Sequence, residues 1–381
     1  MKKFDTITIF ANVLFLLFLM VTIPNCKMND NGEPSQTETP GTWEIIPFGV
    51  TLGVIGDIRN DGTHRIYGLR DHQLVEYFYN NGTWVTTDLN ASGIEIETFD
   101  LIIAKCRRDG RNRLYARGRD NFYGRKIYEI EFVNGNWNIQ LVSDHPGTIL
   151  ELCKGDLQNE GIDSLYYYEG SEKSLVELSY RNGNWVETPI DTTSFDSSSL
   201  WEMCIGEGRD SGIDSIYYLT DRTELFECTC NNGIWERSRI DTLQDLPENT
   251  VDPYLGVHIA RIIDGQAALY AADGSNMYEY YFENNQWRKT SVGEGIAGTT
   301  SLKSGIGRND GITRLYCSAC AGMWYEFWFN GDTDTWIKKE YSMPQHNAIF
   351  NMVVGEGRND GITRIYINQF NLDDYELTYN R

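Results

Sequence analysis

The sequence is short of basic residues, of histidine and of proline. Its 381 residues include 33 Lys and Arg against 55 Asp and Glu, with five His and nine Pro, and the formal net charge is -22 at pH 7. Nucleic acid and anionic membrane surfaces repel a charge of this sign, so neither is expected as a partner. A cationic ligand, a metal ion or plain solubility is compatible with it.

Long apolar stripes at helical spacing are also scarce outside the N-terminus. The chain is instead rich in aromatic residues and glycine, with 23 Tyr, 10 Trp, 16 Phe and 36 Gly. Aromatic residues favour strands and glycine favours turns, so this composition indicates an all-β protein. The length fits either two average domains or one large propeller or barrel.

The N-terminus has the pattern of an export signal. Lys2 and Lys3 precede a mostly apolar run over residues 9–23, which ends at Pro24 and is short for a membrane span. The following Ile23-Pro-Asn-Cys26 resembles the lipobox of bacterial lipoproteins, where a Cys is lipidated and becomes the new N-terminus. The resemblance implies a signal peptide over residues 1–25 and lipidation of Cys26, with further acyl chains for firm anchoring. A plain cleaved signal or an uncleaved anchor is the alternative.

Residues 26–41 are polar and almost free of apolar side chains, which indicates a flexible tether. After it, a glycine recurs about every fifty residues and marks seven repeat units. Five positions beyond each glycine stands a Tyr, and further on each unit has a Glu inside an apolar strand. Six units then pass through an Asn/Gly-rich turn to a Trp. The recurring residues are Gly62, Gly110, Gly161, Gly212, Gly265, Gly311 and Gly361; Tyr67, Tyr115, Tyr166, Tyr217, Tyr270, Tyr316 and Tyr366; Glu76, Glu129, Glu177, Glu227, Glu279, Glu326 and Glu376.

Each unit predicts four strands, joined in turn by an Asp-Gly turn, a variable loop and an Asn-Gly turn. Both turns supply the positive φ that tight hairpins require, and four antiparallel strands at this period are typical of a propeller blade. The seventh unit ends after its third strand at Tyr379, while a strand with Trp43 stands alone before the first unit. We therefore predict an all-β, seven-bladed β-propeller over residues 42–381, whose ring is closed when the Trp43 strand completes the last blade.

Seven cysteines remain besides Cys26, so they cannot all pair within one chain. Cys153 and Cys204 each lie eight residues before the repeat glycine and are expected to be buried core residues. The pair Cys317 and Cys320 suits a strained disulfide or half a zinc site, but no second pair at ligand spacing accompanies it.

The Asp-Gly turn offers a candidate metal site. The stretch Asp57-Ile-Arg-Asn-Asp61-Gly62 resembles the calcium loop of FG-GAP/VCBS-type, integrin-like propellers, which implies oxygen ligands at alternate positions before a Gly. In most units an Arg such as Arg59 takes one of those positions and would repel a cation. The unit without such an Arg supplies the candidate calcium ligands Asp156, Gln158 and Glu160. The alternative, a purely structural turn, is favoured, so no cofactor is expected.

The recurrent Glu looks catalytic only when one copy is considered alone. Seven related copies would make seven active sites or none, so we expect a Tyr–Glu hydrogen bond repeated around the ring. Replacing Glu279 by Gln is then expected to lower the stability. The five histidines occupy unrelated repeat positions, although His258, on the first strand of its unit, could face a central channel. No phosphate-binding loop, HExxH motif or serine elbow is present, so enzyme activity has no positive support.

Recognition is expected on the face that carries the variable loops, because a rigid scaffold usually places specificity in its loops. The longest hairpin there, residues 117–126, is basic and aromatic in an acidic protein. Aromatic faces combined with Arg and amide groups suit glycans or peptides, although the same aromatics can instead seal gaps between blades. The candidate ligand-binding residues are Arg119, Phe122, Tyr123, Arg125, Trp201, Tyr254 and Phe370.

The sequence thus indicates an exported, monomeric, non-catalytic binding or scaffold propeller of the cell envelope, attached to a membrane only by its N-terminus. A glycan or a protein is the expected partner. The alternatives are a dedicated carbohydrate-binding lectin and a polysaccharide lyase or glycosidase, which would need paired carboxylates near the channel mouth. Resemblance to other propeller lipoproteins and lectins concerns the fold alone, and fold does not fix function.

Overall fold

The computed structural model places Gly41–Arg381 in one compact unit. It describes residues 41–49, 51–70, 73–89, 95–120, 124–145, 149–170, 173–191, 200–209, 211–220, 223–243, 255–296, 298–319, 322–369 and 374–380. The regular elements of these residues are β-strands, and no helix among them could cross a membrane.

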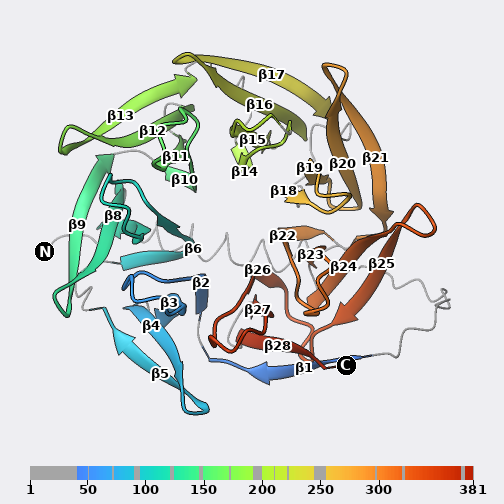
Figure 1. Ribbon diagram of the computed structural model, residues 1–381, viewed down its shortest axis with the longest axis horizontal. Helices are drawn as coiled ribbons and strands as arrows, with labels where there is room; N and C mark the ends of the chain where they lie inside the picture. Colours follow the sequence, from blue (N-terminus) through green and yellow to red (C-terminus); the bar gives the residue numbers. More distant parts are fainter. Residues whose placement is uncertain are drawn as a thin grey trace, which may run out of the picture. The chain divides into compact units, whose positions relative to one another are not determined.

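The strands form seven sheets of four antiparallel strands, arranged as the blades of a ring (Figure 1). From the inside outward, blade 1 has β2 (Thr51–Gly56), β3 (Arg65–Arg70), β4 (Gln73–Asn80) and β5 (Thr83–Asp88); blade 2 has β6 (Glu95–Ala104), β7 (Arg113–Asp120), β8 (Gly124–Val133) and β9 (Asn136–His145). Blade 3 has β10 (Ile149–Gly155), β11 (Ser164–Glu169), β12 (Ser174–Arg181) and β13 (Asn184–Asp191); blade 4 has β14 (Leu200–Gly206), β15 (Ser215–Thr220), β16 (Glu224–Asn231) and β17 (Ile234–Thr242). Blade 5 has β18 (Gly256–Arg261), β19 (Ala267–Ala272), β20 (Asn276–Glu283) and β21 (Gln286–Glu294); blade 6 has β22 (Thr299–Gly305), β23 (Arg314–Ala319), β24 (Met323–Asn330) and β25 (Thr335–Ser342).

The last blade joins the two ends of the propeller. It contains β26 (Ile349–Gly355), β27 (Arg364–Gln369), β28 (Asp374–Asn380) and, as its outermost strand, β1 (Thr42–Pro47). In this pairing Trp43 lies opposite Tyr379 and Ile46 opposite Glu376. The prediction of the fold and of its closure by the Trp43 strand is therefore confirmed.

The tight turns take the positive φ that was predicted, with one difference in the residue that adopts it. In the hairpin between β4 and β5, Asn81 has φ 49° and Gly82 has φ 86°. In the turn between β2 and β3, positive φ falls on Asn60 (57°) and Gly62 (81°), while Asp61 between them is not left-handed. Asp61 instead caps the turn, because its carboxylate accepts the Thr63 N–H at 3.0 Å.

The apolar core is divided into clusters that lie between neighbouring blades. In the cluster between blades 1 and 2, Tyr67 and Leu74 of one blade pack with Leu101, Leu114 and Ala116 of the next. In five blades the Trp of the outer strand meets the recurrent Tyr of the preceding blade edge to face, as in Tyr67 with Trp137 at 6.2 Å between ring centroids. Burial of this kind joins each blade to its neighbour.

The described cysteines are all free thiols. Cys106, Cys228 and Cys317 are buried, whereas Cys153 and Cys204, predicted as buried core residues, pack against the apolar core but are half-buried. Both lie on the innermost strand of their blade and pack against the apolar cluster between that blade and the next. Cys320 is outside the described residues, so the proposed Cys317–Cys320 pairing stays a prediction.

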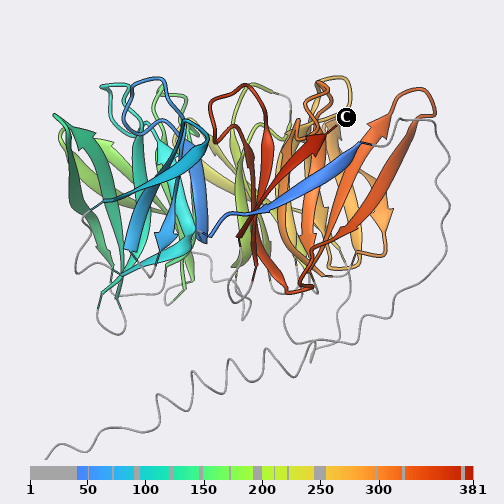
Figure 2. The same cartoon turned by 90° about the horizontal axis from the view of Figure 1, so that it is seen from below.

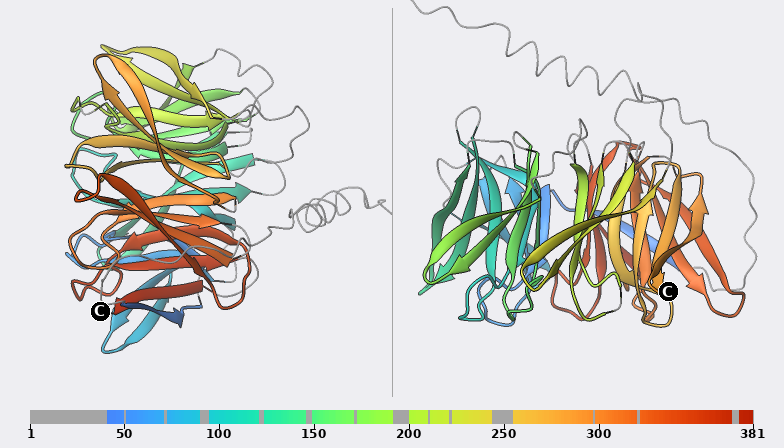
Figure 3. Two further views of the ribbon diagram at one scale, coloured as in Figure 1. Left: turned by 90° about the vertical axis from the view of Figure 1, so that its right-hand side faces the viewer. Right: turned by 90° about the horizontal axis from the view of Figure 1, so that it is seen from above.

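The two faces of the ring carry different connections. Because successive strands are antiparallel, the Asp-Gly and Asn-Gly turns of every blade come together on one face, which we call the turn face (Figure 2, Figure 3). The connections between second and third strands and between blades belong to the opposite face, the loop face. This division agrees with the sequence-based arrangement of uniform turns and variable loops.

Candidate functional site

The recurrent Tyr and Glu lie opposite each other in all seven blades. All seven carboxylates are at most 5% exposed, so each needs partners. The Tyr hydroxyl donates to Glu in five blades: Tyr67 at 3.1 Å, Tyr115 at 2.8 Å, Tyr166 at 3.4 Å, Tyr217 at 3.0 Å and Tyr270 at 2.7 Å. In blade 6 the hydroxyl of Tyr341 donates to Glu326 instead, at 2.9 Å. The hydroxyls of Tyr316 and Tyr366 have no partner in the described part of the chain.

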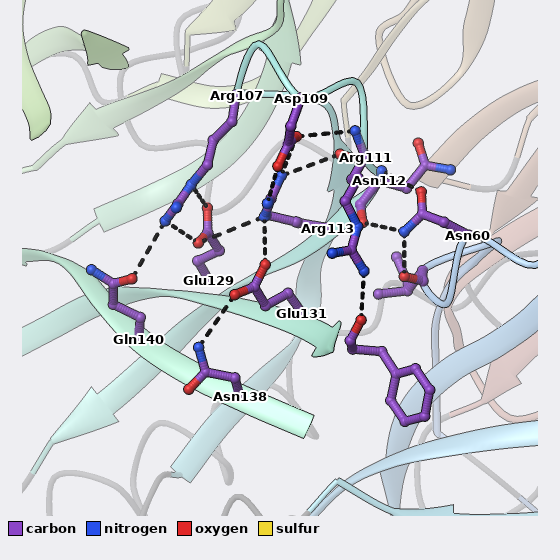
Figure 4. Close-up of polar contacts among 12 residues, drawn as sticks. Asn60, Arg107, Asp109, Arg111, Asn112, Arg113, Glu129, Glu131, Asn138 and Gln140 are labelled. Atoms are coloured by element: carbon purple, nitrogen blue, oxygen red, sulfur yellow. Dashed lines mark hydrogen bonds and ion pairs between the residues drawn. The ribbon is translucent and has the colours of Figure 1, made fainter. Parts of the chain in front are cut away.

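An Arg of the Asp-Gly turn neutralises the buried Glu in five blades. The Nε–carboxylate distances are 2.9 Å for Arg59–Glu76, 3.1 Å for Arg107–Glu129, 2.6 Å for Arg209–Glu227, 2.8 Å for Arg308–Glu326 and 2.9 Å for Arg358–Glu376. In blade 2 a second guanidinium, Arg113, bridges Asp109 and Glu131 (Figure 4). Its hydrogen bond lowers the pKa of Asp109 to about 2, so this carboxylate is ionised at neutral pH.

The same Arg also reaches the next blade. Arg59 stacks over the ring of Phe132 at 4.3 Å, and four other blades repeat this contact: Arg107 over Tyr180 at 4.4 Å, Arg209 over Phe282 at 4.3 Å, Arg308 over Tyr379 at 4.7 Å and Arg358 over Tyr79 at 4.3 Å. We call this set of Tyr, Glu and Arg with the aromatic ring of the next blade the blade joint. Its guanidinium is held on one side by a carboxylate and on another by a π face, an arrangement that stabilises the ring.

Asn side chains in the turns fasten neighbouring blades by paired hydrogen bonds. Asn60 Oδ1 accepts the Asn112 N–H at 2.8 Å, and its Nδ2 donates to the Asn112 carbonyl at 3.2 Å (Figure 4). Asn309 binds the backbone of Thr363 in the same way, and Asn359 binds that of His64. Sequence reasoning missed this role, because the Asn was considered only as a turn residue.

The candidate metal ligands of the turns are engaged in protein contacts. The two carboxylate oxygens of Asp156 accept the N–H groups of Glu160 and Gly161 at 2.7 and 2.6 Å. Gln158 Nε2 points to Glu177, at 2.8 Å from Oε2. The hollow beside these residues has a volume of ≈ 10 Å³, room for about one water molecule. Among the described residues, no three His, Cys, Asp or Glu side chains are grouped so that they could hold a metal ion.

Blade 5 departs from the pattern of the blade joint. Ile262 stands where Arg308 stands in blade 6, and it packs into the apolar core. Glu279 is 5% exposed and accepts hydrogen bonds from the hydroxyls of Tyr270 at 2.7 Å and Thr290 at 3.1 Å. Burial raises its pKa above the ordinary value, despite the hydrogen bonds from those hydroxyls and from Trp336, which lower it. Glu279 therefore receives its hydrogen bonds from hydroxyl groups and Trp336 instead of from an Arg of the turn.

The ligand-binding residues predicted from the sequence cannot be assembled into a site. Phe122, Tyr123, Tyr254 and Phe370 lie outside the described residues, as do the side chains of Arg119, Arg125 and Trp201, and as does Cys26. The predictions for these residues therefore stay predictions.

A hollow of ≈ 540 Å³ lies elsewhere, between blades 4 and 5 near the turn face. It is lined by Arg209, by Ser238, Arg239 and Ile240 of β17, and by Phe282, Asn285, Gln286 and Trp287 of the β20–β21 hairpin. The ring of Phe282 is covered by Arg209, and Trp287 packs on Tyr217 and Phe282. Ser238, Asn285 and Gln286 are exposed and make no side-chain hydrogen bond to the described residues. The blade 4–5 hollow thus offers mainly polar groups to a ligand.

A second set of polar residues lies on the innermost strands of the blades, which form the inner wall of the ring. One residue of each innermost strand pairs with the recurrent Tyr, and these seven equivalent residues are Val54, Ile102, Cys153, Cys204, His258, Lys303 and Val353. They are aliphatic in blades 7, 1 and 2 but titratable in blades 3 to 6. All seven are half-buried, so part of each side chain is open to solvent.

The polar residues of blades 4, 5 and 6 form what we call the inner-wall cluster: Glu202, Cys204, His258, Lys303 and Ser304. His258 Nε2 and Ser304 Oγ are hydrogen-bonded at 2.9 Å, and Glu202 Oε2 accepts the Val257 N–H at 3.1 Å. Gly256 lies against both strands: a Cβ there would be in ordinary contact with Glu202 Oε2 at 3.4 Å but too close to Thr299 Cγ2 at 2.8 Å.

Burial is the largest cause of the shifted pKa values in the cluster. Burial raises the pKa of Glu202 to about 7, although Lys303 and the Val257 N–H lower it. Burial and the charge of Lys303 lower the pKa of His258 to about 3, so its imidazole is neutral under physiological conditions. A Ser–His hydrogen bond is also the geometry of an activated nucleophile, but a base with such a low pKa is a weak proton acceptor at neutral pH. The pair therefore gives little support to hydrolytic chemistry.

Comparison with known proteins supports the fold alone. No protein-family model matches the sequence, and no curated protein matches it. The solved structure of BBS1N in complex with ARL6DN is similar to this chain, with a TM-score of 0.57, 10% identity, and coverage of 87% of this chain and 92% of that one. AofleA from Arthrobotrys oligospora shows a TM-score of 0.46 at 14% identity, covering 81% of this chain and 91% of its own. At 10% identity the likeness to BBS1N concerns the fold alone.

Proposed function

We propose that this propeller is a non-catalytic binding module that recognises a glycan, with the blade 4–5 hollow as the binding site. The observation that carries the proposal is that the hollow, which is of ligand size, contains Ser238, Asn285 and Gln286, whose side chains form no hydrogen bond within the described part of the chain. Hydroxyl and amide groups pair with the many hydroxyls of a sugar, and the guanidinium of Arg239, whose side chain is 59% exposed, adds further donors. The recurrent Glu and Arg residues are used in the blade joints and are not assigned to recognition.

The first test is retention of the purified full-length protein on a glycan array. We expect binding to a defined set of glycans, reduced about tenfold in the Ser238→Ala/Gln286→Ala double variant, since each lost hydrogen bond contributes about 0.5–1.5 kcal/mol. Asn136→Ala is the matched control, because Asn136 precedes Trp137 in blade 2 as Gln286 precedes Trp287 in blade 5. Equal loss in the control, or no retained glycan, would overturn the proposal.

The variable loop face remains a proposed contact surface for a larger glycan or a protein partner. Arg119, Phe122, Tyr123 and Arg125 combine aromatic area with positive charge on one hairpin, which is the observation that supports it. Alanine variants of Phe122 and Tyr123 should then weaken binding without changing the Ser238 and Gln286 contribution. If no glycan binds and cross-linking in the native envelope captures one protein that these variants release, the module is a protein scaffold instead.

We further propose that the protein is exported and anchored through Cys26. The basic start, the apolar run and the lipobox-like Ile23-Pro-Asn-Cys26 support this. Labelling with a clickable palmitate analogue in a bacterial host should mark the wild-type protein and not Cys26→Ala. Label retained in Cys26→Ala would contradict lipidation at this residue, and a cleaved, unlabelled wild type would indicate a plain signal peptide.

A further inference from the structure

We propose that the inner-wall cluster is a second binding site, separate from the blade 4–5 hollow, which takes the carboxylate group of a small ligand through Lys303, His258 and Ser304. These residues come from two adjacent innermost strands, β18 and β22, and are half-buried. These strands are the inner edges of blades 5 and 6, where the residue paired with the recurrent Tyr is polar. The opposite side is aliphatic at Val54, Ile102 and Val353, so the site is confined to one sector.

The ammonium group of Lys303 is the charge that would bind the ligand. Among the residues that the structure describes, Lys303 forms no hydrogen bond or ion pair, although the protein carries a formal net charge of -22. A partly enclosed Lys without a carboxylate partner is unusual, because removal from water is normally offset by an opposite charge. Glu202 is the nearby acid that affects it electrostatically, yet its carboxyl group is bound to the Val257 N–H instead. An anionic ligand would supply the missing partner.

His258 and Ser304 supply a directional donor whichever tautomer the imidazole adopts. If Nε2 accepts from the Ser304 hydroxyl, the proton of the neutral ring is on Nδ1, which is free to donate. If Nε2–H donates to Oγ, the hydroxyl hydrogen of Ser304 is free. In either case one uncharged donor remains on the two strands that also carry the ammonium group of Lys303. A carboxylate, with two acceptor oxygens, matches this combination.

Glu202 makes the site sensitive to pH. The titratable groups that interact with it electrostatically are Cys204 on its own strand, Lys303 on β22 and Cys317 on β23. His258 on β18 interacts with the same Lys303. Burial raises the pKa of the Cys204 thiol well above its usual value and that of Cys317 to about 12, so both stay neutral, as does His258. Between pH 6 and pH 8 Glu202 is therefore the group of this set that changes charge. Its negative form repels an anion, so affinity should fall as the pH rises through about 7.

The test uses acetate as the probe, because acetate stays anionic throughout this pH range. The full-length protein, labelled with ¹³C at the lysine Cε position, is titrated at pH 6 and pH 8 and followed by NMR. We expect a saturable shift of one lysine signal, absent in Lys303→Met, with an affinity at least fivefold lower at pH 8. Lys154→Met is the matched control, because Lys154 lies on the innermost strand of blade 3 and pairs with Asp163 at 3.7 Å. Glu202→Gln should remove the difference between the two pH values.

Two outcomes overturn the proposal. One is that no lysine signal shifts saturably, and the other is that the Lys303→Met protein still binds acetate as the wild type does. If Lys303→Met does not fold, Ser304→Ala, which removes the hydroxyl without altering charge, must weaken binding severalfold, and unchanged binding counts against the site. An unchanged pH effect in Glu202→Gln refutes the role of Glu202. None of these results depends on whether the blade 4–5 hollow binds a glycan.

Discussion

Blades 5 and 6 each bury a Glu opposite a Tyr, but they stabilise the carboxyl group by different means. In blade 6, Glu326 lies between Arg308 and Arg314, and all three side chains are at most 2% exposed. In blade 5, Glu279 has hydroxyl partners and the aliphatic Ile262 replaces the first Arg. The common requirement of the fold is thus a polar partner for the Glu. A guanidinium supplies it in blade 6, hydroxyl groups supply it in blade 5, and the amide of Gln158 contributes in blade 3.

The guanidinium of blade 6 has two separate roles, because it pairs with the buried Glu and also contacts the next blade. A buried ion pair costs desolvation that its Coulomb attraction only partly offsets, so blade 6 need not be more stable than blade 5. Arg308 does more than neutralise Glu326, however, since it also stacks over Tyr379 of blade 7. Blade 5 has Ile262 at this position, packed in the apolar core between blades 5 and 6.

The largest expected effect is the loss of a guanidinium from blade 6. Arg308→Met leaves Glu326 buried with one of its two cations gone and removes the stacking on Tyr379. We expect a loss of about 3–5 kcal/mol in the free energy of unfolding, measured by urea denaturation. The control is Ile262→Met at the equivalent position of blade 5, which should cost less than about 1.5 kcal/mol. Similar costs for both variants would show that the two blades do not differ as described.

A smaller effect is expected when the carboxylate itself is neutralised. Glu326→Gln leaves two buried guanidinium groups without their shared counter-charge and should cost about 2–3 kcal/mol. Glu279→Gln should cost at most about 1 kcal/mol, because an amide oxygen can still accept from Tyr270 and Thr290. The sequence alone predicted a clear loss of stability for Glu279→Gln, and the structure makes it the mildest test of the series. Chemical denaturation of both variants side by side decides, and equal losses would contradict the comparison.

The repeat pattern was enough to predict the propeller, because each observation repeats seven times. The Tyr–Glu register, the paired turns and the Trp43 strand each follow from spacing within one hairpin or from the two incomplete ends. The partners across blades were not predictable in this way. The choice of Phe132 for Arg59, or of Asn112 for Asn60, depends on how separate sheets pack.

The inner-wall cluster shows a further reason why contacts between blades could not be predicted from the sequence. The turn of blade 5 is one residue shorter than those of blades 4 and 6, so counting back from Tyr270 places Val257, and not His258, level with Cys204 and Lys303. In addition, β14 and β22 each contain a bulge, which shifts the register, whereas β18 pairs without one. His258 was noticed from the sequence, but its neighbours Lys303, Ser304 and Glu202 were not.

The pH dependence of stability should also distinguish the two kinds of carboxylate. Burial raises the pKa of Glu279 in the folded protein, so its ionisation costs stability as the pH rises above the ordinary value of 4.5. The hydrogen bond to Arg65 lowers the pKa of Asp61 to about 2, so this group stabilises the fold above pH 3.8 and loses the effect as the pH falls towards 2. The stability of Glu279→Gln relative to the wild type should therefore improve from pH 4.5 to pH 8. The expected gain is about 1.4 kcal/mol for each unit by which the pKa is raised. A difference in the free energy of unfolding between the two proteins that does not change with pH would refute the raised pKa.

The smallest effect is expected from calcium, which tests whether any turn is more than a structural joint. In blade 3, where no Arg occupies the turn, the oxygens of Asp156 already accept backbone N–H groups and Gln158 contacts Glu177. A cation would have to displace these contacts, so we expect the thermal midpoint in millimolar calcium and in EDTA to agree within about 1 °C. A site filled at a hundredfold excess over its Kd would stabilise the protein by about 2.7 kcal/mol and raise the midpoint by several degrees. A rise of that size, lost in Asp156→Asn, would make blade 3 a calcium site and set it apart from the arginine-held blades.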